Sequence, residues 1–267
     1  MGIHRVCVPP DTLDQPTIIL SPSVAHYVMH VLRLRVGDEI AVFDGTGQEC
    51  LVRLTSVAAM HVQGERVAWL ATVRLDPKPF ILGQALPKGT KMDLIVEKCS
   101  ELGLTTLVPL HTDRTVVREA PERLTKKMAR WQRIAAAAAR QCGRRTLLDV
   151  HPPMALGDFC VRYGSAPVKL VCWEEERHHG MRQVLERLTG QSPIVVLIGP
   201  EGGLTVHEVG RAREHGFTTV SLGPRLLRTE TAAIVLTGIV RYSLGELEPS
   251  GDHGEGRVYG EGAHRGQ

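Results

Sequence analysis

Aromatic residues are scarce in this chain of 267 residues, where they make up 4% of the sequence. Platforms on which nucleic-acid bases could stack are therefore few, and any contact with a nucleic acid should be made mainly to phosphate. The chain also has no run of about 18 apolar residues, which excludes a membrane-spanning helix, and its first residues include no apolar stretch of signal-peptide length. We therefore expect no membrane partner.

Cysteine motifs are missing as well. The six cysteines are scattered along the sequence and form no CxxC pair. This pattern predicts neither a disulfide framework nor a zinc site, and it favours reduced thiols in the cytoplasm. His26 and His30 have the i,i+4 spacing that zinc ligands can have, but no third ligand accompanies them. We expect no bound metal.

Two domains are indicated by the change of pattern along the chain. Residues 1–74 alternate short apolar runs with glycine turns, which predicts a small β-barrel interrupted by one helix over 23–34. After the proline-rich segment 76–79, strand and helix patterns alternate through 78–247, which is typical of an α/β domain whose mainly parallel sheet is covered on both faces. Residues 248–267 hold six glycines and predict a disordered tail.

The expected elements follow from the same periodicities. In the first domain the expected strands span residues 17–20, 39–43, 49–56 and 66–73. In the second domain the expected strands span 81–86, 105–110, 168–173, 194–198 and 218–222, and the expected helices span 91–102, 122–142, 181–188, 205–214 and 230–244.

Acidic residues are absent from the segment 123–145, which contains eight lysines and arginines. On a helix that advances by about 100° per residue, five of these side chains fall along one line and apolar side chains fall opposite. The five are Lys126, Arg130, Arg133, Arg140 and Arg144. A solvated helix face usually mixes charge signs. We therefore interpret this face as a surface for a polyanion, with an ordinary solvated face as the alternative.

Two glycine turns near the carboxyl end are the strongest motifs. LIGPEGGLT spans 197–205 and LGPRLLRTETAA spans 222–233, and each lies between a β-branched apolar run and a predicted helix. Because the carboxyl ends of parallel strands meet at one edge of a sheet, the two turns predict one shared pocket for a small ligand. Neither turn matches the GxGxxG or P-loop pattern, so phosphate is not the expected ligand.

These motifs resemble the signature of the 16S rRNA uridine N3-methyltransferases of the RsmE type, in the SPOUT superfamily. Further runs stand where that family has similar ones, and the resemblance covers about residues 3–247. These runs are VLRLRVGDEIAVFDGTG at 31–47, EKCSELG at 97–103, RQCGRR at 140–145 and WEEE at 173–176.

The resemblance implies a fold and a function. It implies a PUA-like β-barrel that helps to hold RNA, followed by a SPOUT-type α/β domain with a carboxyl-terminal trefoil knot. It implies a cytoplasmic homodimer that uses S-adenosylmethionine to methylate N3 of uridine 1498 in the 16S rRNA of the small ribosomal subunit. The alternative is a non-catalytic RNA-binding or ribosome-assembly protein on the same fold. A nucleotide-binding oxidoreductase is disfavoured because the GxGxxG turn is missing.

The resemblance also assigns roles to residues. Glu201 and Glu230 are the candidate bases for removing the uracil N3 proton, and Arg228 is expected to stabilise the uracil oxygens. Catalysis by positioning alone stays open, as does a purely structural role for Glu230 at the start of its helix. The expected cofactor-binding residues are Leu170, Trp173, Leu197, Gly199, Gly202, Gly203, Leu222, Gly223, Leu226, Leu227 and Ala232. The expected RNA-binding residues are Arg5, Arg33, Arg35, Arg114, Arg130, Arg133, Arg140, Arg144, Arg145 and Arg225.

Overall fold

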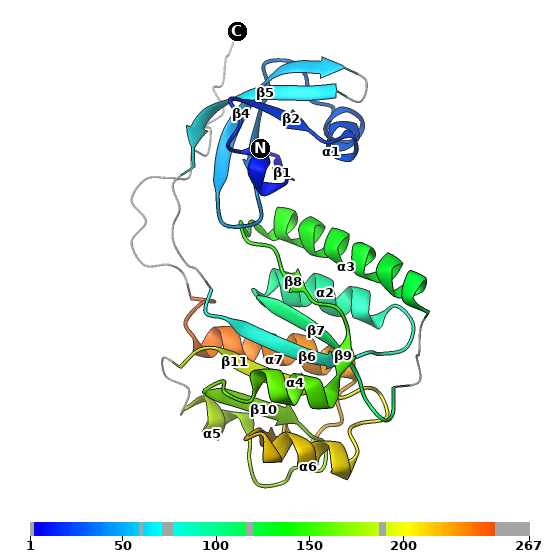
Figure 1. Cartoon of the computed structure of the whole chain (residues 1–267). Helices are drawn as coiled ribbons and strands as arrows, with labels where there is room; N and C mark the ends of the chain where they lie inside the picture. Colours follow the sequence, from blue (N-terminus) through cyan, green and yellow to red (C-terminus); the bar gives the residue numbers. More distant parts are fainter. Residues whose placement is uncertain (1–2, 59–60, 71–76, 116–119, 187–190, 249–267) are drawn as a thin grey trace. The chain divides into compact units, whose positions relative to one another are not determined.

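A computed structural model describes residues 3–58, 61–70, 77–115, 120–186 and 191–248 (Figure 1). The chain divides into two compact units, which comprise Met1–Arg74 and Leu75–Glu248. The expected tail lies almost wholly outside the described residues. The ends of the expected strand 66–73 and helix 181–188 also lie outside them.

The first unit is built on a five-stranded sheet in the order β1-β3-β4-β5-β2. Alternating side chains of β4, namely Cys50, Val52 and Leu54, point into a core of aliphatic residues. The strands are β1 (Arg5–Cys7), β2 (Thr17–Leu20), β3 (Glu39–Phe43), β4 (Glu49–Ala58) and β5 (His61–Trp69), and a short 3-10 turn, η1, spans Pro10–Thr12.

Strand β5 differs from its expected position. The sequence pattern predicts a strand over 66–73 after a turn at Gln63-Gly64, but β5 begins at His61 and ends at Trp69. Gly64 lies within the strand, where a Cβ atom would come within 2.6 Å of the carbonyl oxygen of Arg53. This glycine therefore permits a close approach of two strands beside a register shift, a role that the pattern alone does not distinguish from a turn.

The expected helix 23–34 is also modified. It divides into α1 (Pro22–His26) and a π-helical turn, η2 (Tyr27–Val31). Arg33 follows with a φ of 56°, a left-handed conformation that is rare for a residue with a Cβ atom. The wider turn and Arg33 together end the helix before residue 34.

The second unit contains a seven-stranded sheet whose pairings are all parallel. Its order is β12-β10-β11-β6-β7-β8, with β9 also paired to β7. This confirms the expected parallel α/β architecture. The strands are β6 (Phe80–Ala85), β7 (Thr106–His111), β8 (Asp149–Val150), β9 (Met154–Ala155), β10 (Val168–Cys172), β11 (Ile194–Ile198) and β12 (Thr218–Val220).

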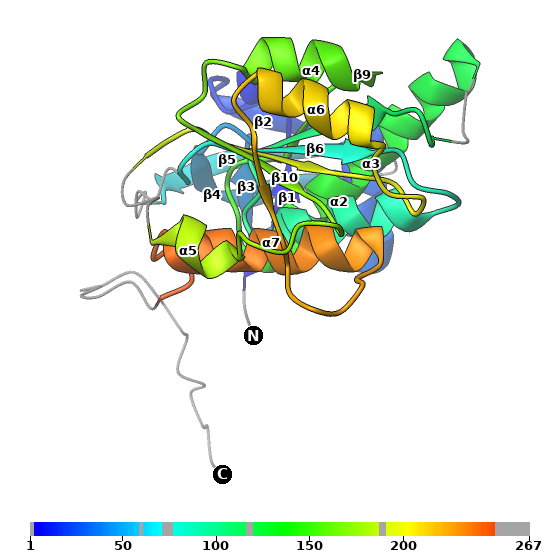
Figure 2. The ribbon, with the colours of Figure 1, turned by 90° about the horizontal axis from the view of Figure 1, so that it is seen from below.

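Helices cover both faces of this sheet. Figure 2 shows α4 and α6 on one face and α2, α5 and α7 on the other. The helix α4 and the short strands β8 and β9 are absent from the sequence prediction, because each is short and α4 has no side-chain cap to mark its start. The helices are α2 (Lys91–Glu101), α3 (Pro121–Cys142), α4 (Leu156–Tyr163), α5 (Met181–Leu185), α6 (Val206–Glu214) and α7 (Thr229–Ser243).

No helix in the described part of the chain is both long and apolar enough to cross a membrane. The two faces of the sheet pack into two hydrophobic cores, one that includes Leu82, Ile95 and Leu236 and one that includes Val108 and Val195. These cores hold the strands rigidly, so the loops at their carboxyl ends are presented from a fixed base.

Candidate functional site

A pocket of about 520 Å³ opens at the carboxyl ends of β10, β11 and β12. This volume suits a small organic ligand. Three segments form most of its wall. They are residues 172–175 with Arg177 after β10, residues 198–201 with Gly203 after β11, and residues 221–229 after β12, with Ala232 added from α7. The two glycine turns thus share one pocket, as the sequence predicts.

Most of the expected cofactor-binding residues lie on this wall. Leu170 and Leu197 do not, because they precede the strand ends and their side chains are buried within the two cores. Gly202 is also off the wall, and it faces the side chain of Arg114. The wall includes Trp173, Gly199, Gly203, Leu222, Gly223, Leu226, Leu227 and Ala232.

The two turns are tied to each other by Thr229, which the sequence prediction missed. Its hydroxyl donates a hydrogen bond of 2.7 Å to the carbonyl oxygen of Gly199. The Nε2 of Gln84, a side chain with no exposed surface, donates in turn to the Thr229 hydroxyl at 2.9 Å. A buried polar link of this kind fixes the spacing of the two turns.

Gly203 is required by the geometry of the first turn. Its φ is +70°, and a Cβ atom there would overlap the carboxylate of Glu174, which lies in the wall segment after β10. Its N–H donates to the carbonyl oxygen of Pro200 at 2.9 Å, which closes the turn. A residue other than glycine would be strained and would also displace Glu174.

Glu201 projects from the same turn toward Lys91 of α2. Its Oε1 accepts hydrogen bonds from the Lys91 Nζ at 2.8 Å and from the Lys88 N–H at 3.0 Å. Burial alone would raise the pKa of Glu201, but the hydrogen bonds from Lys91 and from backbone N–H groups hold that pKa below its ordinary value. Glu201 is therefore a poor proton acceptor near neutral pH. Lys91 was missed because the LPKGTK segment matches no phosphate-binding pattern.

Glu230 lies in the first turn of α7 and is buried, with 8% of its surface exposed. Its Oε2 is 3.6 Å from the Lys91 Nζ and has no hydrogen-bond donor among the described residues. Leaving a buried carboxylate oxygen without a donor is unfavourable. Glu230 is not on the pocket wall itself, so it lies behind the second turn.

Replacing Lys91 with methionine should raise the pKa of Glu201 toward its ordinary value. A carboxylate with a lowered pKa contributes stability above its unfolded pKa, and that stability is lost as the pH falls through the folded pKa. In the variant this loss should begin at higher pH. Titration of ¹³C-labelled glutamate by NMR measures the shift. The control is Lys98→Met, which removes a lysine of α2 that pairs with Glu97 and Glu101. An unchanged Glu201 titration in the Lys91 variant would contradict the assignment.

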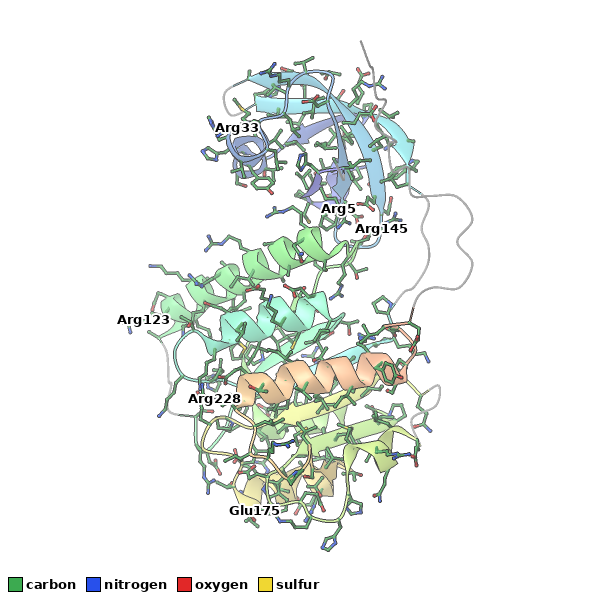
Figure 3. All side chains as sticks on the ribbon, turned by 180° about the vertical axis from the view of Figure 1, so that it is seen from behind. Arg5, Arg33, Arg123, Arg145, Glu175 and Arg228 are labelled. Carbon is green, nitrogen blue, oxygen red and sulfur yellow. The ribbon has the colours of Figure 1, made fainter. Side chains whose placement is uncertain are left out.

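Arg225 and Arg228 are exposed on the pocket wall, on either side of Leu226 and Leu227. Arg228 is the residue that precedes α7, and Figure 3 shows it at the start of that helix. Its side chain therefore stands beside the pocket at the positive end of the helix dipole. This arrangement favours a ligand group that is anionic or becomes so.

The basic helix is confirmed as α3, with Trp131 and Ala135 buried and Lys126, Arg130 and Arg133 exposed. The guanidinium of Arg130 already pairs with Asp93 of α2 at 2.9 Å, so an RNA phosphate would compete with this carboxylate for it. Because Asp93 lies in α2, the sequence of α3 does not show that this acidic partner is present.

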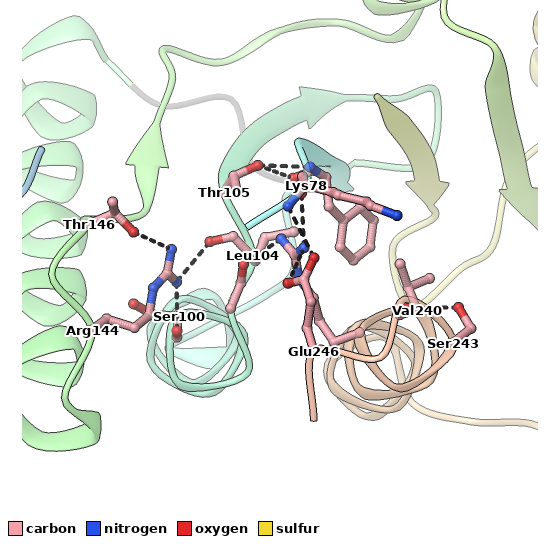
Figure 4. A network of polar contacts seen from close by, with 12 residues as sticks. Lys78, Ser100, Leu104, Thr105, Arg144, Thr146, Val240, Ser243 and Glu246 are labelled. Atoms are coloured by element: carbon pink, nitrogen blue, oxygen red, sulfur yellow. Dashed lines mark hydrogen bonds and ion pairs between the residues drawn. The ribbon is translucent and has the colours of Figure 1, made fainter. Parts of the chain in front are cut away.

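The prediction that Arg144 continues the basic face of α3 is wrong. The helix ends at Cys142, and Gly143 takes the left-handed conformation with a φ of 88°. The Arg144 guanidinium then turns inward and donates to the carbonyl oxygens of Ser100 and Leu104 at 2.7 and 2.9 Å (Figure 4). Burial lowers the pKa of Arg144 to about 10, which leaves it charged at neutral pH.

The remaining expected RNA contacts differ in accessibility. Arg5 pairs with Glu49 at 2.7 Å and lies over the ring of Phe43, so much of its side chain is used within the first unit. Arg114 donates to the carbonyl oxygen of Gly202 at 2.6 Å. Arg140 and Arg145 are half-buried, whereas Arg33 and Arg35 are exposed. The arginine positions are marked in part in Figure 3.

The histidine pair of the first unit has its rings 4.5 Å apart. Within the residues that the structure describes, no three histidine, cysteine, aspartate or glutamate side chains are grouped as metal ligands would be.

Comparison with protein families identifies both units. Residues 74–241 match the model of an RNA methyltransferase domain, and residues 20–64 match the model of an RNA methyltransferase PUA domain. The chain is similar to the ribosomal RNA small subunit methyltransferase E of Synechocystis sp., with 34% identity over 87% of this chain and 75% of the relative. It is 31% identical to that of Bacillus subtilis over 86% of this chain and 91% of the relative.

A solved structure is also similar. The ribosomal RNA small subunit methyltransferase E from Neisseria gonorrhoeae, bound to S-adenosyl methionine, superposes with a TM-score of 0.79 at 30% identity. The match covers 90% of this chain and 98% of that one.

Proposed function

Because the chain belongs to the family of ribosomal RNA small subunit methyltransferases E, we propose that it methylates N3 of one uridine in 16S rRNA, uridine 1498 by family resemblance. It is an S-adenosylmethionine-dependent rRNA methyltransferase with a PUA domain. The observation that carries the proposal is the pocket formed by the two glycine turns, which Thr229 ties together and Arg228 borders.

The pocket wall fits the cofactor. Gly223 on this wall has open space where a Cβ atom would stand, so a ligand can approach its backbone closely. The Nε1 of Trp173 is buried at this wall and has no acceptor among the described residues, so it is available to a polar atom of a ligand. When bound, S-adenosylmethionine supplies an electrophilic methyl group on a positively charged sulfur.

The protein's part in the chemistry is to orient the uracil and to stabilise the charge that forms when the N3 proton leaves. The N3 atom of uracil becomes an effective nucleophile only as its proton leaves, and this loss places negative charge on the ring oxygens. We assign stabilisation of that charge to Arg228. We assign the proton to neither candidate base, because Glu201 accepts hydrogen bonds from Lys91 and the Lys88 N–H, and Glu230 lies behind the pocket wall, 3.6 Å from the same lysine. We propose that the proton leaves to solvent.

RNA binding is proposed for the exposed basic side chains of α3, Arg33 and Arg35 of the first unit, and Arg225 at the pocket. The target base must leave its stack to enter the pocket, so these side chains would hold the flanking phosphates. The small ribosomal subunit is the proposed partner, which places the protein in the cytoplasm. We also propose a homodimer and a trefoil knot of the segments that follow β11. Val235 and Tyr242 on the outer surface of α7 are exposed and would suit a subunit contact.

Reversing the charge of Lys126 and Arg133 should weaken RNA binding and reduce the slope of log Kd against log salt concentration by about 2. Arg130 is left unchanged in this variant, because a glutamate at position 130 would face Asp93. Fluorescence anisotropy with an rRNA fragment over a range of salt concentrations measures both quantities. The control is Arg182→Glu, an exposed arginine of α5. An unchanged slope in the double variant would exclude α3 from the RNA surface.

Mass spectrometry of 16S rRNA tests the proposed function directly. We expect cells that lack the protein to lose methylation at N3 of one uridine, and the purified protein with S-adenosylmethionine to restore it. The same methylation persisting in cells without the protein would contradict the proposal.

A further inference from the structure

The loop after β10 contains a buried carboxylate that the proposed mechanism does not use. Glu176 is 5% exposed, although Glu174 and Glu175 immediately before it are exposed and line the pocket. An acidic side chain is rarely buried unless its charge is compensated. The surroundings of Glu176 therefore indicate what it holds in place.

Glu176 accepts hydrogen bonds at both carboxylate oxygens. Its Oε1 accepts from the N–H groups of His178 and His179 at 2.7 and 3.1 Å, and its Oε2 accepts from the hydroxyl of Thr219. The Arg213 Nη2 lies 3.8 Å from the same Oε2. These donors, the Thr219 hydroxyl above all, lower the pKa of Glu176 to about 2, so it is ionised throughout the physiological range.

The partners of Glu176 lie in segments that lead to two different walls of the pocket. Residues 173–180 form the loop after β10, whereas Thr219 lies in β12, directly before the loop 221–228. Arg213 joins the two, since it donates to the Thr219 hydroxyl at 2.8 Å and lies over the ring of Trp173 at 5.4 Å.

Backbone hydrogen bonds run in parallel with these side-chain contacts. The N–H of Trp173 donates to the carbonyl oxygen of Val220 at 3.1 Å, and the N–H of Ser221 donates to that of His179 at 2.9 Å. Glu176 is the one buried charge between the two ends of this ladder within the described residues. Removing it would leave the N–H groups of His178 and His179 without their acceptor.

We propose that Glu176 is a positioning residue that holds the Trp173–Arg177 wall of the pocket against the wall after β12 and thereby sets the affinity for S-adenosylmethionine. The inference rests on the proposed function, since it concerns the same pocket. Glu176 contacts no pocket ligand in this assignment. It acts through Trp173 and through the loop that carries Glu174 and Arg177.

Substitutions at both ends of the hydrogen bond test the proposal. Glu176→Ala should raise the Kd and KM for S-adenosylmethionine by about tenfold to a hundredfold. The variant loses the carboxylate's hydrogen bonds to the loop after β10 and to Thr219 of β12. The kcat at saturating cofactor should change by less than about threefold. Glu176→Gln should have an intermediate effect, because its amide oxygen still accepts the two backbone N–H groups. Calorimetry and steady-state kinetics give these values.

Thr219 provides a second pair of variants that keeps the shape of the site. Thr219→Val removes the hydroxyl and should weaken cofactor binding, whereas Thr219→Ser retains it and should bind as the wild type does. The control is Glu246→Gln, which alters a carboxylate of the same unit that faces Arg241 and accepts the Lys78 N–H but does not line the pocket.

The outcomes separate this inference from the proposed function. Loss of affinity in Glu176→Ala and Thr219→Val, with retention in Thr219→Ser and Glu246→Gln, supports the positioning role. Wild-type affinity in the Glu176 and Thr219 variants, or an equal loss in Glu246→Gln, overturns it while the proposed function stands. Failure of the wild-type protein to bind S-adenosylmethionine would overturn both.

Discussion

Replacing Arg228 with alanine should lower kcat for rRNA methylation by roughly 10²–10³-fold, the usual cost of removing one donor that faces a developing negative charge. Arg228 is exposed on the pocket wall at the start of α7, where the helix dipole adds to its charge. The affinity for S-adenosylmethionine should change little, because the turns that surround the pocket stay intact. Single-turnover methyl transfer and calorimetry separate the two effects.

Arg225 supplies the matched control for Arg228. It is exposed on the same loop and also lines the pocket, three residues earlier. We expect Arg225→Ala to raise the KM for RNA and to leave kcat nearly unchanged, because its assigned role is to hold phosphate. If Arg228→Ala changes only the KM for RNA, as Arg225→Ala does, then Arg228 has no role in the chemical step.

Replacing Arg241 with methionine should reduce the free energy of unfolding by about 3–5 kcal/mol, the typical cost of leaving a buried charge and its acceptors unpaired. Arg241 has no exposed surface. Its Nη1 donates to the Lys78 carbonyl oxygen and to the Glu246 Oε2, both at 2.8 Å, and its Nη2 donates to the Gly103 carbonyl oxygen (Figure 4). One side chain thus joins α7 to the segment before β6 and to the end of α2.

Urea denaturation followed by circular dichroism measures the effect at Arg241. The control is Arg182→Met, because Arg182 is 93% exposed and should contribute within about 0.5 kcal/mol. A second variant, Arg241→Met with Glu246→Leu, removes both charges and should recover part of the lost stability. Equal stability of Arg241→Met and Arg182→Met would show that the buried network contributes nothing.

Local sequence patterns were sufficient for much of the second unit. Continuous apolar runs predicted β10, β11 and β12, because the strands of a parallel sheet are buried on both faces. The helical period of apolar residues predicted most of the helices. The two glycine turns were recognised because only particular residues fit a tight strand-to-helix link. In the first unit the same rules misplaced β5, since Gly64 serves a close strand contact and not a turn.

The sequence gives the number of charged side chains on α3, but it does not show which groups those side chains contact. The sequence alone determined that α3 is amphipathic and basic. It did not determine that Asp93 pairs with Arg130 or that Arg144 turns inward, because those partners come from other elements and depend on where α3 ends. A helical projection is valid only within the helix, and the left-handed Gly143 ends it.

The sequence by itself determined the composition of the pocket's two turns and, through them, the family and its cofactor. The tertiary structure decided how those turns work together. Thr229 links them, Lys91 keeps Glu201 ionised, and Glu230 is left with an oxygen that has no donor among the described residues. The contacts of Thr229 and Lys91 join residues that are distant in the sequence, and periodicity carries information only about neighbours along one helix or strand.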